Sequence, residues 1–272
     1  MQLRIRHIST YRFASPARFV VQSHRLMPAT FQGQNVLDWN VSAKSGIFGT
    51  YFRDAAGDQI RTLSVSGPVS DLAILVQGTV ETTDMSGVLQ GLRETISPLS
   101  YMRPTPTTRP DAGLRDLADA ALAGQTGVSE LDRAHLLSAA VSRAIAYRPG
   151  VTAMHTTAAE ALEQRQGVCQ DHAHALIALA NHTQIPARYV CGYLFARSDG
   201  SDESASHAWA ELYVGSLGWV GFDPANQCCP DERYIRLGSG ADAYEAAPIR
   251  GLSHGGATES LDVTVAVESI QQ

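Results

Sequence analysis

The most informative stretch of this chain is Gly167-Val168-Cys169-Gln170-Asp171-His172. Two shorter stretches follow it, Ser206-His207-Ala208-Trp209 and Gly221-Phe222-Asp223-Pro224. Together they carry a cysteine, a histidine and an aspartate in that order. Nucleophilic thiol chemistry needs this trio, because the thiol must lose a proton, an imidazole must hold that proton, and a carboxylate must orient the imidazole.

The pattern after Cys169 predicts a helix that begins at this residue. Apolar residues recur at helical spacing, at Ala173, Leu176, Ile177 and Ala180. Free backbone N–H groups and the positive end of the helix dipole favour a thiolate in the first turn, and the N–H of Cys169 is placed to serve as an oxyanion-hole donor. We expect Gly167 to allow a tight turn that points the sulfur into a cleft. The alternative is a buried structural cysteine, which would need neither the glycine nor the helix start.

Period-two patterns place His207 and Asp223 on neighbouring strands. In the strand 206–214, His207 shares a face with Trp209, while the small apolar residues on the opposite face predict the core. His207 is therefore expected on the functional or solvent side. If Val214 pairs with Gly218 across a three-residue loop, Trp209 lies opposite Asp223 and His207 lies one diagonal step away. A two-residue loop would put Asp223 on the wrong face. Taken singly, a surface histidine and a turn-forming aspartate remain the alternatives.

Other side chains near the trio have competing interpretations. His172 lies on the same helical face as Cys169, but it is too close to approach a substrate carbonyl in line and lacks an orienting carboxylate. His172 and His174 point about 200° apart on a helix, so they cannot share one metal ion. Both are better interpreted as core or surface histidines. We expect Trp209, Trp219 and Gln170 to contact substrate, although strand tryptophans more often serve packing.

Four motifs in combination resemble the bacterial transglutaminase-like superfamily, a papain-like group often described as cysteine proteases. They are Gly167-Val168-Cys169-Gln170-Asp171, Ile185-Pro186-Ala187-Arg188-Tyr189-Val190-Cys191-Gly192-Tyr193, Ser206-His207-Ala208-Trp209-Ala210-Glu211 and Gly218-Trp219-Val220-Gly221-Phe222-Asp223-Pro224. The N-terminal 82 residues are similar to the β-domain that accompanies this core in many bacteria. The segment from Pro230 to Gly251 resembles the family's C-terminal extension. Gln227-Cys228-Cys229 departs from the family, where glycine and apolar residues are expected.

The resemblance implies a Cys–His–Asp triad at Cys169, His207 and Asp223, and acyl transfer through a thioester. A glutamine side chain or a peptide bond in a protein or peptide substrate would be attacked, and an amine or water would accept the acyl group. We expect neither a cofactor nor a metal, because no acidic loop has calcium-site spacing. The alternative function is a non-catalytic protein-binding module on the same fold.

The composition limits the class of protein and the kinds of partner that the chain can have. The 272 residues are 44% hydrophobic and 18% charged, as in a globular protein with a proper core. A net charge of −6 argues against nucleic acid or an anionic membrane as partner. The first residues alternate like a strand and lack a signal-peptide core, so we expect a cytoplasmic protein whose four cysteines are free thiols. The oligomeric state is left open.

The fold class that we predict is α+β: an N-terminal β-sandwich followed by a papain-like, transglutaminase-like core of helices on an antiparallel sheet. Turn signals separate short strand-like runs over residues 1–85, and a proline-rich linker covers 86–110. Helical periodicity and then alternation define a catalytic core over 111–236. A C-terminal extension, 237–272, ends in a strand that we expect to pack on the N-terminal domain.

Overall fold

Two long antiparallel strands frame the N-terminal part of the structure, a computed structural model that describes residues 1–195, 206–255 and 258–270. These strands, β1 (Gln2–His24) and β5 (Gln59–Thr82), pair along nearly their whole length, with irregularities between Arg12 and Phe19. The remaining strands of this part flank them: β2 (Gln34–Ala43), β3 (Ile47–Phe48), β4 (Phe52–Arg53), β12 (Ile249–His254) and β13 (Glu259–Ser269). Thus β13 and β12 pair with the first and second halves of β1, while β2, β3 and β4 pair with β5.

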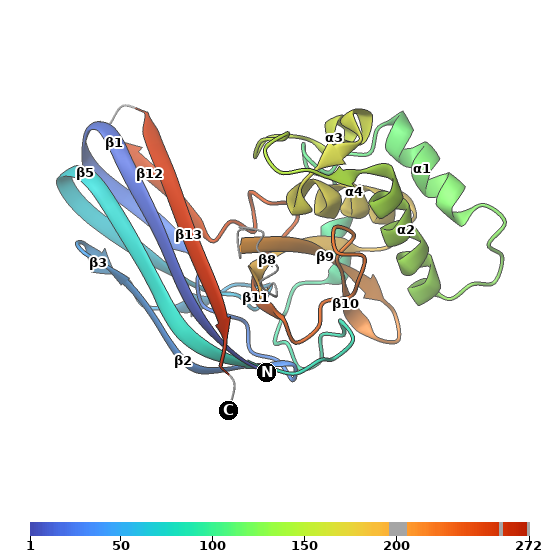
Figure 1. Ribbon diagram of the computed structural model, residues 1–272, viewed down its shortest axis with the longest axis horizontal. Coiled ribbons are helices and arrows are strands. Elements are labelled where there is room, and N and C mark those ends of the chain that lie inside the picture. Colours follow the sequence, from blue (N-terminus) through green and yellow to red (C-terminus); the bar gives the residue numbers. More distant parts are fainter. Residues whose placement is uncertain (196–205, 256–257, 271–272) are drawn as a thin grey trace.

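The predicted sandwich is one hydrogen-bonded sheet that bends so that its two halves face each other. Alternate residues of β1 are buried, as period two requires. One hydrophobic cluster includes Tyr11 and Leu72 from the first half of the sheet together with Val20 and Leu63 from the second. Figure 1 shows β1 and β5 curving together at the edge of the molecule away from the helices.

The core domain packs four helices on an antiparallel sheet, so the α+β class is confirmed. The sheet has the order β10-β9-β8-β11. Its strands are β8 (Ala187–Leu194), β9 (Ser206–Val214), β10 (Gly218–Phe222) and β11 (Tyr234–Gly240), and the helices are α1 (Ala112–Leu122), α2 (Glu130–Ala144), α3 (Ala158–Gln164) and α4 (Cys169–His182). The 3₁₀ turn η1 (Pro98–Met102) and the short parallel pair β6 (Ala146–Tyr147) and β7 (Gln166–Gly167) complete the described elements.

Helix α4 lies at the centre of this domain, between the sheet and the other three helices. Residues 171–181 are all buried, so the helix is covered on every side rather than along one stripe. The helices around it begin with side-chain caps at Asp111, Ser129 and Thr157, and Thr157 forms a full capping box with Glu160. The starts of these helices are therefore fixed locally by sequence, whereas the place of α4 is fixed by packing.

The two domains share a continuous interior. Leu3 and Ile5 of β1 belong to the same hydrophobic cluster as Tyr193 of β8, and His7 Nδ1 lies 2.8 Å from the Tyr193 hydroxyl. Residues 86–110 also lie against the core, since Leu89 N–H donates to the Trp219 carbonyl at 2.9 Å. Strand β11 runs to Gly240, so the core sheet continues past the predicted boundary at residue 236.

Buried ion pairs reinforce this junction. The Glu211 carboxylate on β9 accepts from Arg188 at 2.6 Å and from Arg236 at 2.8 Å. Arg236 also reaches Asp58 at 3.1 Å, and Arg188 reaches Glu94 at 2.6 Å. The face of β9 that carries His207 and Glu211 is therefore mostly covered, so of the two alternatives expected for it, a functional or a solvent side, the solvent side is wrong.

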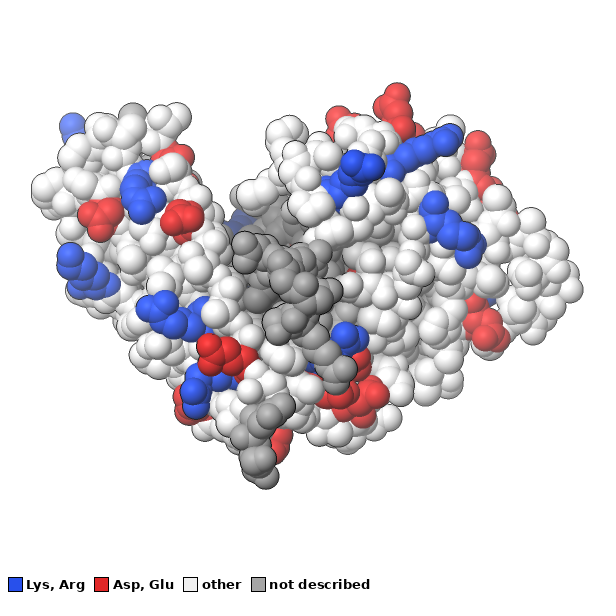
Figure 2. Space-filling model, in the orientation of Figure 1, with Lys and Arg blue, Asp and Glu red and all other residues white. Residues whose placement is uncertain are grey.

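Charge is dispersed over the surface seen in Figure 2. Basic and acidic residues alternate on both domains of that face, which is hollowed between the sheet domain and the helices. Within the described residues, every helix is too short or too polar to cross a membrane.

Candidate functional site

The hairpin of β9 and β10 has the predicted register. Val214 pairs with Gly218, which has a φ of 78° in the left-handed region that suits glycine. Phe222 pairs with Ala210, so the next position along the hairpin brings Asp223 to Trp209. The three-residue loop is thus confirmed, and it puts Asp223 on the His207 side of the hairpin.

His207 lies between Asp223 and Cys169. Its Nε2 is 2.6 Å from Asp223 Oδ2, and the Cys169 side chain is near enough to raise the pKa of His207. Because Asp223 takes Nε2, the nitrogen left to face the thiol is Nδ1. The Cys169 residue is half-buried, the His207 side chain is 8% exposed and Asp223 is fully buried. The geometry is that of a nucleophile, a base and an orienting carboxylate.

The Asp223 carboxylate accepts five hydrogen bonds. Oδ1 accepts from the backbone N–H groups of Ala225 at 3.0 Å and Asn226 at 3.2 Å. Oδ2 accepts from His207 at 2.6 Å, from Asn226 Nδ2 at 2.8 Å and from the Tyr234 hydroxyl at 2.8 Å. Sequence reasoning missed Asn226 and Tyr234. The turn-forming sequence after Asp223 could have indicated Asn226, but Tyr234 lies on β11 and gives no local signal.

These contacts set opposite pKa shifts in the pair. Burial lowers the pKa of His207, but hydrogen bonds to Asp223 and Cys169 outweigh it and raise that pKa from 6.5 to about 10. Burial alone would raise the pKa of Asp223, yet the hydrogen bond and charge of His207, with Asn226 and Tyr234, bring it below its usual value. The two contacts therefore favour the charged forms of both groups, an imidazolium beside a carboxylate.

The start of α4 is fixed by Asp171. Its Oδ2 accepts from the Val168 N–H at 2.8 Å and from the Thr152 hydroxyl at 2.6 Å. A Cβ added to Gly167 would lie 2.7 Å from the Asp171 Cβ, so glycine is needed there for this close approach. The φ of Gly167 is outside the left-handed region, which corrects the tight-turn explanation. As predicted, Cys169 is the first helical residue, where backbone N–H groups lack intrahelical partners.

Trp219 was expected to contact substrate, and the structure shows instead that it packs inside the protein. It is 4% exposed. Its indole N–H donates to Glu94 at 2.6 Å, the Arg188 guanidinium lies 4.0 Å from the centre of the ring, and Tyr101 meets it edge-on. The segment after the N-terminal domain therefore covers Trp219.

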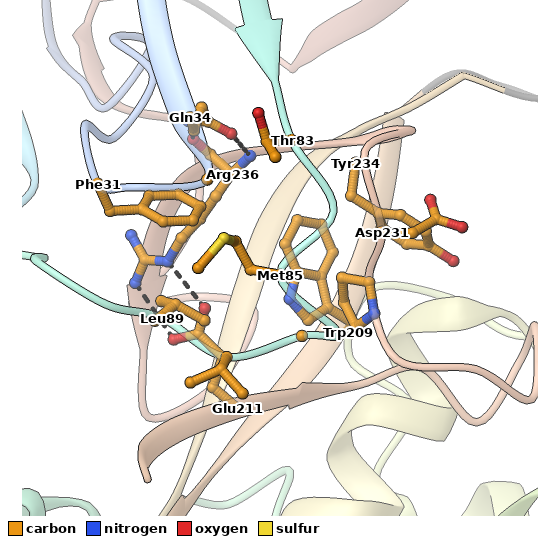
Figure 3. A pocket seen from close by; sticks show the side chains of 14 residues that line it. Phe31, Gln34, Thr83, Met85, Leu89, Trp209, Glu211, Asp231, Tyr234 and Arg236 are labelled. Carbon is orange, nitrogen blue, oxygen red and sulfur yellow. Dashed lines mark hydrogen bonds and ion pairs between the residues drawn. The ribbon is translucent and has the colours of Figure 1, made fainter. Parts of the chain in front are cut away.

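Trp209 is also buried, at 2% exposure, and so does not line an open substrate channel. Its ring is stacked against His207, with centroids 6.4 Å apart, and meets Tyr234 edge-on. On its other side lies a cavity of about 40 Å³ between the domains. Figure 3 shows Phe31 and Met85 beside this cavity and Arg236 bonded to Glu211 at its wall. That volume suits a few water molecules rather than a peptide.

Three other side chains of α4 were considered for the site: Gln170 is half-buried, and His172 and His174 are buried. Gln170 is half-buried next to Cys169 and donates to the Met154 carbonyl at 3.2 Å, so its contact with substrate stays a prediction. His172 and His174 are core histidines, as expected, with exposures of 1% and 0%. Burial lowers the pKa of His174 to about 4.

The other cysteines are free thiols. Burial raises the pKa of Cys191 to about 12 and that of Cys229 to about 11, and it also raises the pKa of Cys228. Among the described residues, no three His, Cys, Asp or Glu side chains gather where they could hold a metal ion.

Two parts of the chain match known protein families. Residues 115–224 match the family described as the transglutaminase-like superfamily, and residues 3–81 match the bacterial transglutaminase-like N-terminal region. The uncharacterized protein ML0607 of Mycobacterium leprae is 28% identical over 285 residues, which cover 98% of each chain. The uncharacterized protein Rv2569c of Mycobacterium tuberculosis is 38% identical over 131 residues, which cover 44% of this chain and 42% of that one.

A solved structure with a similar fold is that of a "putative cysteine protease" from Cytophaga hutchinsonii. It superposes with a TM-score of 0.76 at 20% identity and covers 100% of this chain and 91% of the other. At this identity the likeness concerns the fold, including the pairing of an N-terminal sheet domain with a helical core.

Proposed function

Since this chain belongs to the transglutaminase-like superfamily, we propose that it is a thiol enzyme that transfers the acyl group of an amide through a thioester on Cys169. One observation carries the proposal: His207 is hydrogen-bonded to the buried carboxylate of Asp223 and lies near enough to the Cys169 side chain for that thiol to raise its pKa. A purely structural histidine does not need a half-buried thiol on one nitrogen and a fully buried carboxylate on the other.

In the proposed reaction, His207 gives one proton to the leaving group and regains one from the acceptor. The Cys169 thiolate adds to the amide carbonyl carbon, and the oxyanion that forms is stabilised by the backbone N–H of Cys169. The C–N bond then breaks, and His207 gives its proton to the departing nitrogen. The thioester carbon is attacked by water or by an amine, whose proton passes to His207, and the C–S bond then breaks to release the product. The thiolate and the imidazolium are thereby restored.

The substrate that we propose is a protein or peptide, attacked at a glutamine side chain or at a peptide bond. The dispersed charge on the face seen in Figure 2 and a net charge of −6 suit such a substrate better than a polyanion. The two possible acceptors leave different products. Transfer to an amine makes a new amide, whereas transfer to water makes a carboxylate.

The test is incubation with a glutamine-containing peptide library, with and without a labelled primary amine, followed by mass spectrometry. We expect amine adducts, deamidated peptides or cleaved peptides, all lost in Cys169→Ala and His207→Gln. Cys229→Ala is the matched control and should keep full turnover, because its thiol is not bonded to the His207–Asp223 pair. If nothing turns over, or if Cys169→Ala leaves the product yield unchanged, the enzyme assignment fails and a binding module takes its place.

A further inference from the structure

A chain of hydrogen bonds continues from Asp223 through Tyr234 to Cys228. Tyr234, the first residue of β11, donates its hydroxyl proton to Asp223 Oδ2 at 2.8 Å. The Cys228 Sγ lies 3.3 Å from the same hydroxyl oxygen. Because the hydroxyl has one proton and gives it to the carboxylate, the thiol is the donor in this second contact. The order is therefore Cys228 to Tyr234 to Asp223.

Tyr234 is not what orients the carboxylate. Oδ1 is already held by two backbone N–H groups, and the Asn226 side chain holds Oδ2. What Tyr234 adds is one more donor on Oδ2, the oxygen that accepts from His207. When a carboxylate oxygen accepts from more donors, its hydrogen bond to each of them is weaker.

We propose that Tyr234 is a positioning residue that weakens the stabilisation of the His207 imidazolium by Asp223, so that the proton on the nitrogen facing Cys169 can leave for the departing amine. This inference rests on the proposed thiol mechanism and deepens it. The ring of Tyr234 also meets the His207 ring edge-on, with centroids 5.8 Å apart, and thereby shields the short bond between His207 and Asp223. A phenylalanine would keep that shielding and lose only the donor.

Among the residues that the structure describes, few other ionisable groups face this pair. Cys169 faces His207 from α4, and Tyr234 faces Asp223 from β11. Cys228 approaches from the loop after β10, where Asp231 and Arg233 form an ion pair at 2.7 Å. Burial and the Asp223 carboxylate both raise the pKa of Tyr234, so its hydroxyl stays protonated and able to donate.

The test is a direct titration of His207 by nuclear magnetic resonance in protein carrying ¹³C-labelled histidine. The protein has nine histidines, and the signal of His207 is the one that disappears in His207→Gln. In Tyr234→Phe, the His207 midpoint should rise by about half a pH unit, because one donor to the shared oxygen is gone. Cys228→Ala should raise it by less, and the double variant should match Tyr234→Phe alone. Tyr213→Phe on β9 is the control and should titrate like the parent protein.

A midpoint that stays unchanged or falls in Tyr234→Phe overturns the proposal and leaves Tyr234 as a packing residue. Should Tyr234→Phe fail to fold, Cys228→Ala decides by the same readout, and an unchanged midpoint there overturns the chain of donors. The proposed function fails differently, by loss of any difference between the parent protein and Cys169→Ala in peptide turnover. The two ideas are therefore separable.

Discussion

Asp223→Asn separates the charge of this residue from its shape. The Oδ1 position must stay an oxygen, because the N–H groups of Ala225 and Asn226 point at it. The new NH₂ group then takes the place of Oδ2 and faces three donors, one of which is His207 Nε2. His207 can accommodate it only by accepting at Nε2 and carrying its proton on Nδ1, toward Cys169. An imidazole in that tautomer cannot take the thiol's proton.

The size of the effect follows from the pKa of His207. The parent value of about 10 exceeds the ordinary 6.5 by about 3.5 units, which at 1.36 kcal/mol each corresponds to about 5 kcal/mol as an upper bound. The Cys169 contact supplies part of it. We therefore expect the loss of Asp223's charge to cost about 3 kcal/mol of folding free energy at pH 6, and turnover to fall about 10³- to 10⁴-fold.

The sign of the pH dependence is fixed by the two shifts. The raised pKa of His207 stabilises the fold fully below pH 6.5, and this contribution is lost as the pH rises toward 10. The lowered pKa of Asp223 stabilises the fold above its usual value of 3.8 and is lost in acid. The gap in unfolding free energy between parent and Asp223→Asn should thus be widest from about pH 4 to 6.5 and should narrow steadily toward pH 10.

Urea unfolding of both proteins at pH 5, 6.5, 8 and 9.5 measures this gap. A gap that stays constant across the series would refute the assignment of the charge pair. So would a gap that widens toward pH 9.5.

Two further predictions concern the framework of the site. Gly167→Ala forces a Cβ to within 2.7 Å of Asp171. It should therefore lower the free energy of unfolding in urea by about 1–3 kcal/mol and slow alkylation of the thiol at the start of α4. Unchanged stability and an unchanged alkylation rate would contradict the close-approach role. Glu211→Gln leaves two buried arginines facing a neutral amide and should cost about 3–5 kcal/mol. The exposed pair of Arg103 with Glu245 is its control, since Glu245→Gln should cost at most about 1 kcal/mol, and equal losses in the two variants would contradict this account.

The parts of the site that the sequence predicts are those set by local rules. The helix start at Cys169 follows from periodicity, and the approach of His207 to Asp223 follows from alternation and a three-residue loop. Both depend on residues within about 20 positions of each other, where register decides which side chains meet.

The parts that escaped prediction depend on what covers each surface. Trp219 is buried because the segment with Glu94 and Tyr101 crosses it, and alternation along a strand does not say which face another segment will cover. Glu211 shares a strand face with His207, yet its arginine partners come from β8 and β11. Tyr234 likewise reaches Asp223 from the far edge of the sheet. Such contacts arise only from tertiary packing.

The most direct test of a catalytic thiol at Cys169 is the rate at which each cysteine reacts with iodoacetamide at neutral pH, followed by peptide mass spectrometry. Burial raises the pKa of Cys228, and it raises that of Cys229 to about 11, so both should react slowly. Cys169, half-buried at a helix start beside the His207 imidazolium, should be alkylated at least about tenfold faster. That advantage should vanish in His207→Gln. A Cys169 that reacts no faster than Cys228 and Cys229, or that keeps its rate without His207, would contradict the proposed thiol enzyme.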